Sequence, residues 1–577
     1  MSAVAGHAPG SGGATAVRGV RRRGRRVLGA DPTGLVLGTL FALQAMTPSL
    51  LPRTWLFQGV VSGLSAAIGY GAGVVLAWLV RRTTVHHWVA VRADRWVSDR
   101  VRRTAWVVLL VTVVVALLVV LVIAADGQRQ ARALVGLPPE TSAGWLRAAP
   151  VIVTLAVGVV AVARGLRSLV RRIAGLLRRW VPVPHRAAQA VAGVLVALLV
   201  AGIVEGVVLR WALSAADATF SVSNDTTPDG VTQPQADERS GSPASLSPWD
   251  SLGHHGQDFV AGGPSRVRMA QASGLADTDV QIPIRAYVGL EGADGFDGQA
   301  ELAVAELERT GAFDRAVLLV ITTTGTGWVD GAAPDALELM YGGDTATVAT
   351  QYSYLPSWIS FLVDRSRAQE AGRTLFQAVH TRVQALPEDR RPRLLVYGES
   401  LGSHGSEAAF EGLLDIREQA DGVLWTGPPN SNELWAQLVE RRDPGTPEVA
   451  PVYAGGLAVR FADSPAELLQ PEAPWLEPRI AYLMHPTDPI TWWSPDLLFT
   501  RPDWLEERRG NGVNPAMSWY PAVTFWQVSA DLTNADSPPM GYGHNYAAHL
   551  LDAWAIIAPP PGWTVADTDR ARTVFPY

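Results

Sequence analysis

The sequence predicts a chain of two parts, an α-helical transmembrane N-terminal domain followed by a domain with a mostly parallel sheet flanked by helices. Long apolar stretches are concentrated in residues 1–210, and from about residue 255 short apolar runs alternate with amphipathic stretches. The charge divides in the same way. Residues 1–210 hold 25 Arg and 6 acidic residues, whereas residues 211–577 hold 23 Arg and 48 acidic residues. Two regions in different physical surroundings account for this division.

Five apolar stretches are long enough to cross a bilayer core, which requires about 20 helical residues. They are residues 34–51, 59–80, 105–125, 150–170 and 187–209. The third has no charged residue and is the clearest, whereas Pro48 interrupts the first. The Arg-rich segment 164–180 is interpreted as an amphipathic helix at the membrane interface rather than as a span.

The distribution of Arg among the loops predicts the orientation of the chain. Residues 18–26, 81–103 and 164–186 hold six, seven and seven Arg, and the intervening loops hold one and three. Positively charged loops stay in the cytoplasm, so the N-terminus is expected inside. Five crossings then place the chain after residue 210 outside the cytoplasmic membrane, and an even number of crossings would reverse that result.

The composition excludes several kinds of site. The chain of 577 residues has no Cys and no Lys, so all 48 basic residues are Arg. Disulfides, thiolate metal sites and Cys nucleophiles are therefore ruled out, as is chemistry that depends on a lysine amine. The sequence has no evident cluster of metal ligands, and its acidic second half is unsuited to nucleic-acid binding. We expect no cofactor, no metal and no nucleic-acid partner.

Changes in composition along the chain predict four segments. They are a basic cytoplasmic arm (1–30), a transmembrane domain of about five helices (31–211), a flexible linker (212–252) and a second folded domain (253–577). The linker is rich in Ser, Asp, Pro, Thr and Gly and poor in large apolar residues. Strands are expected at 282–290, 316–322, 347–354, 393–397, 422–426, 480–484 and 522–528, with helices at 298–310, 364–386 and 402–416.

A candidate nucleophile lies in the motif Gly398-Glu399-Ser400-Leu401-Gly402. A bare GxSxG motif is weak, but here a buried strand is expected to end at Tyr397 and a helix to begin near Gly402. That context is the nucleophile elbow of the α/β-hydrolase fold, in which the serine lies at a sharp strand-to-helix turn. The helix N-terminus then directs free N–H groups at developing negative charge. We therefore expect residues 253–577 to adopt an α/β-hydrolase fold with Ser400 as nucleophile.

The serine hydroxyl needs a base, and in this fold the acid and then the histidine follow the nucleophile along the chain. His404 lies one turn into the nucleophile helix, and His485 precedes the best candidate acid. His549 falls within an apolar helical stretch. His544 remains, in the glycine-rich loop 541–545 after the last expected strand. We expect His544 to be the general base.

Asp488 is the favoured triad acid. It follows the strand expected to end near Met484, and parallel sheets place their sites at the carboxyl ends of strands. Asp463 also follows an apolar run and competes for the role, and Asp531 is a less favoured alternative. The ordinary structural interpretation of Asp488 is a turn aspartate before Pro489.

An oxyanion hole in this fold uses the N–H that follows the serine and a second N–H from the loop after an earlier strand. Leu401 is expected to supply the first. The Gly-rich loop 322–328 is expected to supply the second, with Thr324 and Gly325 as its candidate donors. An ordinary turn is the alternative interpretation of that loop.

Several stretches resemble the actinobacterial-type membrane α/β-hydrolases, a family with a multi-span N-terminal domain and a C-terminal hydrolase domain. These stretches are TPSLLPR (47–53), QGVVSGLSAAIGYG (58–71), ELERTGAFDRAVLLVITTTGTGWVD (306–330), GDTATVATQYSYLPSWISFLVD (343–364), YGESLGSHG (397–405) and HPTDPITWW (485–493). The resemblance covers most of the chain outside the N-terminal arm and the linker. It implies a hydrolase fold but no particular substrate.

Three functions are consistent with these features. The leading hypothesis is a membrane-anchored serine hydrolase that cleaves an ester or thioester, with a lipid or another acyl ester of the cell envelope as substrate. Acyl transfer to an envelope acceptor is the second hypothesis, because only the exclusion of water separates it from hydrolysis. A catalytically inactive membrane scaffold or transport accessory is the third, since a fold alone does not establish activity. No feature predicts an oligomeric state.

Overall fold

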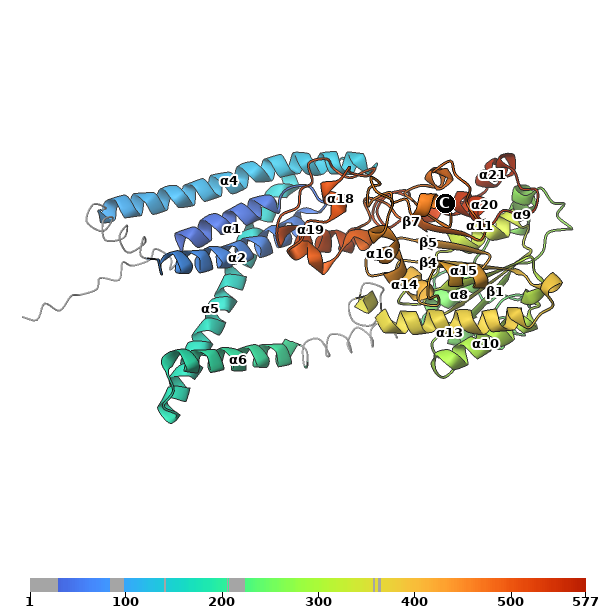
Figure 1. Cartoon of the computed structure of the whole chain (residues 1–577), viewed down its shortest axis with the longest axis horizontal. Coiled ribbons are helices and arrows are strands. Elements are labelled where there is room, and N and C mark those ends of the chain that lie inside the picture. Colours follow the sequence, from blue (N-terminus) through green and yellow to red (C-terminus); the bar gives the residue numbers. More distant parts are fainter. Residues whose placement is uncertain are drawn as a thin grey trace, which may run out of the picture.

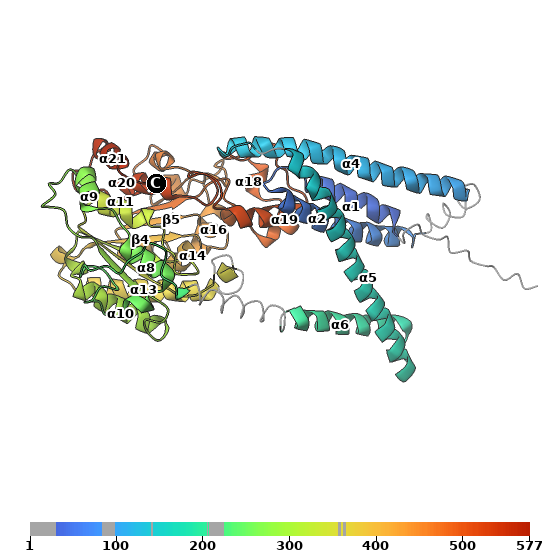
Figure 2. The same cartoon turned by 180° about the vertical axis from the view of Figure 1, so that it is seen from behind.

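The computed structural model describes residues 30–83, 98–139, 142–204, 206, 224–355, 359–361 and 365–577. These residues form two parts that lie end to end, a set of long helices and a domain built on a sheet (Figures 1 and 2). We call them the helical part and the sheet domain. Nearly all of the expected basic arm (1–30) and residues 212–223 of the expected linker lie outside the described residues.

Four helices in the described part of the chain are long and apolar enough to span a membrane. The helices of the helical part are α1 (Pro32–Gln44), α2 (Trp55–Val80), α4 (Asp99–Leu134), α5 (Ala148–Trp180) and α6 (His185–Ile203), with a short 3-10 helix at Ser142–Arg147. The second to fifth expected spans correspond to α2, α4, α5 and α6. With only 13 residues, α1 is shorter than the others.

Two expectations about these helices are wrong. The first expected span, 34–51, is not one helix, because α1 ends at Gln44 and residues 45–54 form a loop. That loop contains Pro48 and Pro52, which lack the N–H that a helix interior requires. The Arg-rich segment 164–180 is not a separate interfacial helix either, because α5 runs unbroken from Ala148 to Trp180.

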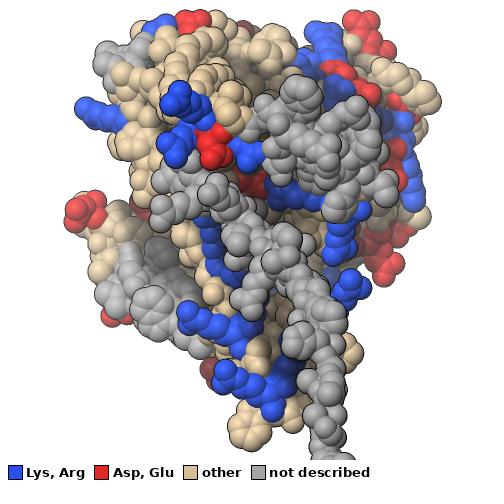
Figure 3. Space-filling model, turned by 90° about the vertical axis from the view of Figure 1, so that its left-hand side faces the viewer, with Lys and Arg blue, Asp and Glu red and all other residues tan. Residues whose placement is uncertain are grey.

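Successive helices of the helical part run in opposite directions along its length. Asp31 at the start of α1 pairs with Arg81 at the end of α2, with 2.5 Å between the charged atoms. This pair lies at the end away from the sheet domain, where α4 also begins (Figure 1). From the sheet domain α5 leads away and α6 returns toward it (Figures 1 and 2). Figure 3 faces the far end and shows blue Arg side chains spread across it.

The sheet domain contains a seven-stranded sheet in which all neighbouring strands are parallel. In chain order the strands are β1 (Ile284–Val288), β2 (Val317–Thr322), β3 (Thr345–Thr350), β4 (Arg393–Glu399), β5 (Gly422–Thr426), β6 (Val459–Ala462) and β7 (Arg479–Leu483). In space their order is β1-β3-β2-β4-β5-β7-β6. Every expected strand except the one at 522–528 is present, and the edge strand β6 was not expected. The predicted fold class, a helical N-terminal part followed by a parallel sheet flanked by helices, is confirmed.

The strand expected at 522–528 is wrong, because helix α19 (Val523–Asp531) occupies this stretch. A short apolar run does not distinguish a strand from a buried helix by its period alone. Val523 and Ala530 on this helix pack against Ala45 and Val61 of the helical part, which is why the run is apolar. The helix expected at 402–416 is likewise two helices, α14 (Leu401–Glu407) and α15 (Leu413–Gln419).

Helices cover both faces of the sheet and form two buried cores. One core includes side chains from α10 (Gly295–Arg309), α13 (Arg365–Gln384), α15 and α16 (Glu433–Glu440). The other includes side chains from α8 (Gly253–Ala261), α9 (Arg266–Ser273), α11 (Ala332–Met340), α20 (Leu550–Ile557) and α21 (Val565–Arg572). The short helix α17 (Pro489–Trp492) follows β7. Helices α18 (Asp503–Glu506) and α19 lie between the sheet and the helical part (Figure 1).

The described part of the expected linker packs on the sheet domain. The N–H of Ser240 donates to Arg285 O at 3.0 Å, and the N–H of Arg285 donates to Glu238 O at 3.1 Å, which extends the edge of the sheet beside β1. The Glu306 carboxylate also accepts a hydrogen bond from the N–H of Ser247 at 3.1 Å. Residues 224–252 are therefore not a free tether. Their backbone groups are fixed by hydrogen bonds to the sheet domain.

Candidate active site

Ser400 lies between the end of β4 and the start of α14. Its backbone angles, φ 54° and ψ −127°, fall outside the regions that non-glycine residues ordinarily adopt. Such strain persists only where the surrounding structure enforces it. Here β4 is paired on both sides, and the N–H of Ser400 donates to Thr426 O at the end of β5 at 2.9 Å. The turn has the strained geometry of a nucleophile elbow.

The two glycines of the motif are required by the close approach of neighbouring backbone. A Cβ on Gly398 would lie 2.6 Å from Gly402 O, across the turn. A Cβ on Gly402 would collide with Thr322 O at the end of β2. The absence of side chains at both positions therefore lets Ser400 lie directly beside the loop 322–328.

The structure brings His544 and Asp488 together. The Nδ1 atom of His544 lies 2.6 Å from Asp488 Oδ2, and both side chains are buried. The Asp488 carboxylate also accepts hydrogen bonds from the Tyr546 hydroxyl at 2.8 Å and from the N–H of Ile490 at 2.8 Å. These donors fix the carboxylate, which in turn fixes the orientation of the imidazole.

The competing acids lie elsewhere. Asp463 accepts a hydrogen bond from Asn511 Nδ2 at 2.6 Å. Asp531 is fully buried against Arg53, with 3.6 Å between the charged atoms. Neither of these contacts involves His544, so the geometry favours Asp488 as the partner of the imidazole.

The other downstream histidines have different partners. His404 Nδ1 contacts Asn432 Oδ1 at 3.1 Å on the far side of the nucleophile helix. His485 Nδ1 contacts Gly543 O at 2.9 Å and its ring stacks on Tyr546. His485 therefore supports the loop that carries His544, a role that its place just before Asp488 in the sequence does not suggest.

Ser400 and His544 both lie beside the end of β5. Ser400 contacts Thr426, as described, and a Cβ on Gly427 would collide with the ring of His544. The Nε2 atom of His544 is buried and makes no hydrogen bond within the part of the chain that the structure describes. A nitrogen in this position can accept the proton of a serine hydroxyl once a substrate tightens the site.

The negative charges around His544 control its protonation. Burial alone lowers the pKa of the imidazole, but the charge and hydrogen bond of Asp488 and the charge of Glu399 outweigh burial and raise that pKa to about 9. Glu399 Oε1 lies 4.0 Å from His544 Nε2, on the opposite side of the ring from Asp488. The imidazole is therefore held between two carboxyl groups.

Glu399 and Asp330 form a buried carboxyl pair that the sequence interpretation missed. Burial and then the charge of Asp330 raise the pKa of Glu399 well above its usual value, and burial also raises the pKa of Asp330. The Tyr397 hydroxyl donates to Glu399 Oε2 at 2.9 Å. Glu399 ends β4, and Asp330 lies in the loop after its neighbour β2, so the pair depends on a strand order that the sequence pattern did not provide. No group of three or more His, Cys, Asp or Glu side chains among the described residues is arranged to hold a metal ion.

The predicted oxyanion donors differ in their hydrogen bonding. Leu401 is the first residue of α14, where an N–H has no acceptor within the helix. The N–H of Thr324 donates to Trp328 O at 3.1 Å and closes a turn in the loop, so this amide is already engaged. The loop thus uses the donor of Thr324 for its own turn, and Gly325 lies in the same turn. Both residues stay predictions as oxyanion donors.

Comparison with known protein families covers most of the chain. A model described as the alpha/beta-hydrolase family matches residues 284–571, and one described as the N-terminus of that family matches residues 46–264. No curated protein and no solved structure matches the chain. The N-terminal match covers most of the helical part and the beginning of the sheet domain, and the other match covers most of the sheet domain. This is the order that the resemblance implied, and the matches support a hydrolase-like function. The chain therefore belongs to the alpha/beta-hydrolase family.

Proposed function

We propose that the protein is a membrane-anchored serine hydrolase that cleaves an ester or thioester through Ser400, His544 and Asp488. The observation that carries the proposal is the 2.6 Å contact between His544 and Asp488, beside a serine in a strained elbow. An inactive module would have no need for a strained serine beside a buried, oriented imidazole, because strain of this kind costs about 1–3 kcal/mol.

In the proposed mechanism His544 Nε2 accepts the proton of Ser400 as Oγ attacks the carbonyl carbon. Asp488 stabilises the imidazolium that forms. The N–H of Leu401 and a donor from the loop 322–328 stabilise the oxyanion. The tetrahedral intermediate expels an alcohol or thiol, which takes the proton from His544 and leaves an acyl-enzyme. Water then attacks the acyl group by the same steps and releases the acid.

The position of the site relative to the helical part supports a substrate that resides in or near a membrane. Helices α14 and α16 at the carboxyl ends of the strands lie on the side of the sheet that faces the helical part (Figures 1 and 2). A lipid or another acyl ester of the cell envelope suits a site that faces the helices in this way. The Arg-rich far end of the helical part supports a cytoplasmic N-terminus (Figure 3). Among the described residues only four helices are long enough to span a membrane by themselves. The chain from Asp31 to the loop 45–54 also runs from the far end to the sheet domain, and counting it as a fifth pass places the sheet domain on the outer side.

The test is labelling with a fluorophosphonate that cannot cross membranes, on intact cells and on lysed membranes. Wild type should be labelled in both preparations, and Ser400→Ala in neither. Labelling of wild type only after lysis would keep the hydrolase and reverse the proposed orientation. A folded wild-type protein that reacts in neither preparation would contradict the catalytic assignment. Unlabelled wild type that transfers acyl groups from an ester to alcohols in preference to water would identify an acyltransferase.

A further inference from the structure

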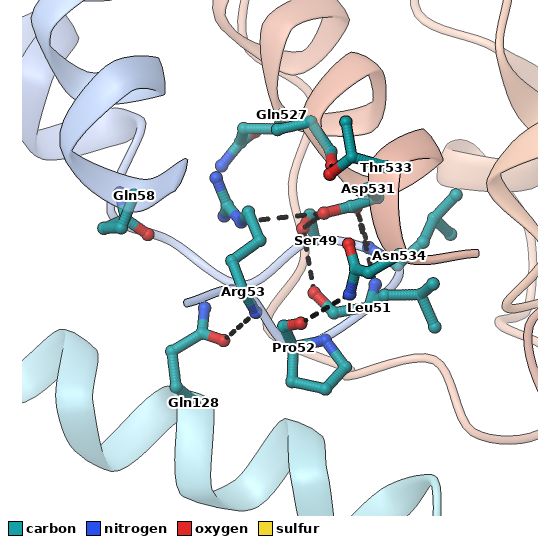
Figure 4. Close-up of polar contacts among 12 residues, drawn as sticks. Ser49, Leu51, Pro52, Arg53, Gln58, Gln128, Gln527, Asp531, Thr533 and Asn534 are labelled. Carbon is teal, nitrogen blue, oxygen red and sulfur yellow. Dashed lines mark hydrogen bonds and ion pairs between the residues drawn. The ribbon is translucent and has the colours of Figure 1, made fainter. Parts of the chain in front are cut away.

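The loop between α1 and α2, residues 45–54, connects two helices of the helical part but is buried against the sheet domain. We call it the hairpin loop. Ser49, Leu50, Leu51 and Arg53 are each no more than 2% exposed. Figure 4 shows the loop between α4 on one side and the end of α19 on the other. Loops ordinarily run over a surface, because their backbone polar groups need partners.

Asp531, the last residue of α19, is the main polar partner of the hairpin loop. Its carboxylate accepts a hydrogen bond from Ser49 Oγ at 2.9 Å and from the N–H groups of Leu50 and Leu51 at 3.1 and 3.4 Å (Figure 4). Arg53 Nε lies 3.6 Å from the same carboxylate. A buried carboxylate is tolerated only when its charge and lone pairs are matched in this way. The hairpin loop therefore supplies the groups that allow Asp531 to be buried.

Two amide side chains of the sheet domain also bind the backbone of the hairpin loop. Gln527 Nε2 donates to Thr47 O at 3.0 Å, and Asn534 Nδ2 donates to Pro52 O at 3.0 Å. Leu50 belongs to the same hydrophobic core as Val528 and the sheet side chains on that face. The loop is thus packed and hydrogen-bonded as an internal segment of the sheet domain.

The segment that binds the hairpin loop also supports the candidate base. Ala535 directly follows Asn534, and its carbonyl oxygen accepts a hydrogen bond from the N–H of His544 at 2.9 Å. Gly543 has a φ of +59°, and a Cβ there would collide with Ala535 O. The loop that carries His544 therefore rests directly on the residue next to Asn534, and a shift of that segment moves the imidazole.

We propose that the hairpin loop positions the base of the catalytic triad, acting through Asp531, Asn534 and Ala535 on His544. The inference rests on the proposed function, because it takes His544 as the base. It gives the N-terminal helices a role beyond anchoring, since they contribute a segment that the active site needs. The competing explanation is a simple tether between the two parts, which would affect stability and leave His544 unchanged.

The experiment measures how fast the full-length protein, in native membranes, reacts with a fluorophosphonate. Asn534→Ala removes one hydrogen bond to the hairpin loop and is mild enough to fold. Its rate constant should fall about tenfold, which corresponds to about 1.4 kcal/mol in the barrier. The acid limb of its pH–rate profile should also move, because that limb reports the protonation of His544. A tether would change neither quantity in the folded protein.

A double-mutant cycle tests the contact at Asp531. If Ser49 acts through Asp531, Ser49→Ala combined with Asp531→Asn should react no more slowly than Asp531→Asn alone. Glu338→Gln is the matched control, because Glu338 is also a buried carboxylate of the sheet domain, paired with Arg285 on β1. It should lower the melting temperature and leave the rate constant and pH profile of the folded protein unchanged.

The outcomes separate the two proposals. Folded wild-type protein that does not react would overturn the proposed function and this inference with it. Reactive wild type, with Asn534→Ala showing the same rate constant and pH profile, would overturn the inference alone and leave a tether. Asn534→Ala decides the matter even if Asp531→Asn fails to fold.

Discussion

Asp488, in the turn after β7, and Asp531, at the end of helix α19, are two buried carboxylates. The charge of each needs compensation, and the structure provides it in two different ways. Both carboxylates are fully buried, and both accept several hydrogen bonds, Asp488 from its own turn and from Tyr546, and Asp531 from the hairpin loop. Asp488 faces His544, which gains and loses a proton in the proposed mechanism. Asp531 faces Arg53, which keeps its charge. In the proposed function, a partner that can lose its proton suits Asp488 to catalysis, whereas a partner with a permanent charge suits Asp531 to joining the two parts of the molecule.

The largest expected effect is the loss of catalytic activity when Asp488, the proposed triad acid, is replaced. Asp488→Asn should lower kcat by roughly 10⁴-fold, because an amide at this position favours the wrong tautomer of the histidine. The comparison variant is Asp463→Asn, which should retain nearly full activity. Turnover of a chromogenic ester by both variants is the measurement. Loss of activity in Asp463→Asn, with activity retained in Asp488→Asn, would make Asp463 the triad acid in place of Asp488.

For the free energy of unfolding we expect the larger loss at Asp531 rather than at Asp488. Asp531→Asn leaves Arg53 buried without a counter-charge and should lower the free energy of unfolding by about 3–5 kcal/mol. Asp488→Asn should cost less, because His544 can release its proton and remain buried as a neutral ring. Chemical denaturation of both variants in the same detergent tests this order. A larger loss for Asp488→Asn would contradict it.

The pH dependence of the reaction should reflect the charges on both sides of His544. The imidazole acts as a base only when neutral, and its pKa is raised to about 9, so the reaction rate with fluorophosphonate should increase as the pH approaches 9. Glu399→Gln removes negative charge near Nε2 and thereby lowers the pKa of His544. The acid limb should then move to lower pH, by up to about one unit.

Asp330→Asn provides a companion variant for that measurement. The charge of Asp330 raises the pKa of Glu399, so Asp330→Asn should leave Glu399 more fully ionised beside His544 and move the acid limb to higher pH, opposite to Glu399→Gln. A limb that stays in place in both variants would show that the pair does not act on the imidazole.

The smallest expected effects come from removing one hydroxyl beside each aspartate. Tyr546→Phe removes a donor to Asp488, and Ser49→Ala removes a donor to Asp531. Each should cost about 1.5–3 kcal/mol of unfolding free energy, since each hydrogen bond is made to a buried charge. Tyr546→Phe should also lower kcat more than Ser49→Ala does, because Tyr546 contacts the triad acid directly. Equal effects on kcat would weaken the distinction between the two sites.

Local patterns along the chain were sufficient to predict most of the sheet and the residues around Ser400. The strand before Ser400, the turn and the helix after it are contiguous, so their geometry depends on neighbouring residues. The strand expected at 522–528 failed because its apolar residues pack against Ala45 and Val61 rather than within the sheet. The span expected at 34–51 failed because its last residues serve the sheet domain rather than a membrane helix.

Contacts between distant segments could not be predicted from such patterns. Asp531 was considered only as an alternative triad acid, because its partners Ser49 and Leu50 lie far away in the chain. The engaged amide of Thr324 is a detail of one turn, and a glycine-rich sequence permits several such turns. The carboxyl pair of Asp330 and Glu399 depends on which strands are neighbours, which the sequence pattern does not specify.

The burial of the hairpin loop constrains how relatives of this protein can diverge. A substitution at Asp531 alters a surface to which both ends of the gene contribute, so the two regions must change together. A chimera that joined the helices of one relative to the sheet domain of another would inherit mismatched halves of one contact. Residues 45–54 and α19 therefore form a single structural unit for the design of such chimeras, although Leu50 and Asp531 are 481 positions apart in the chain.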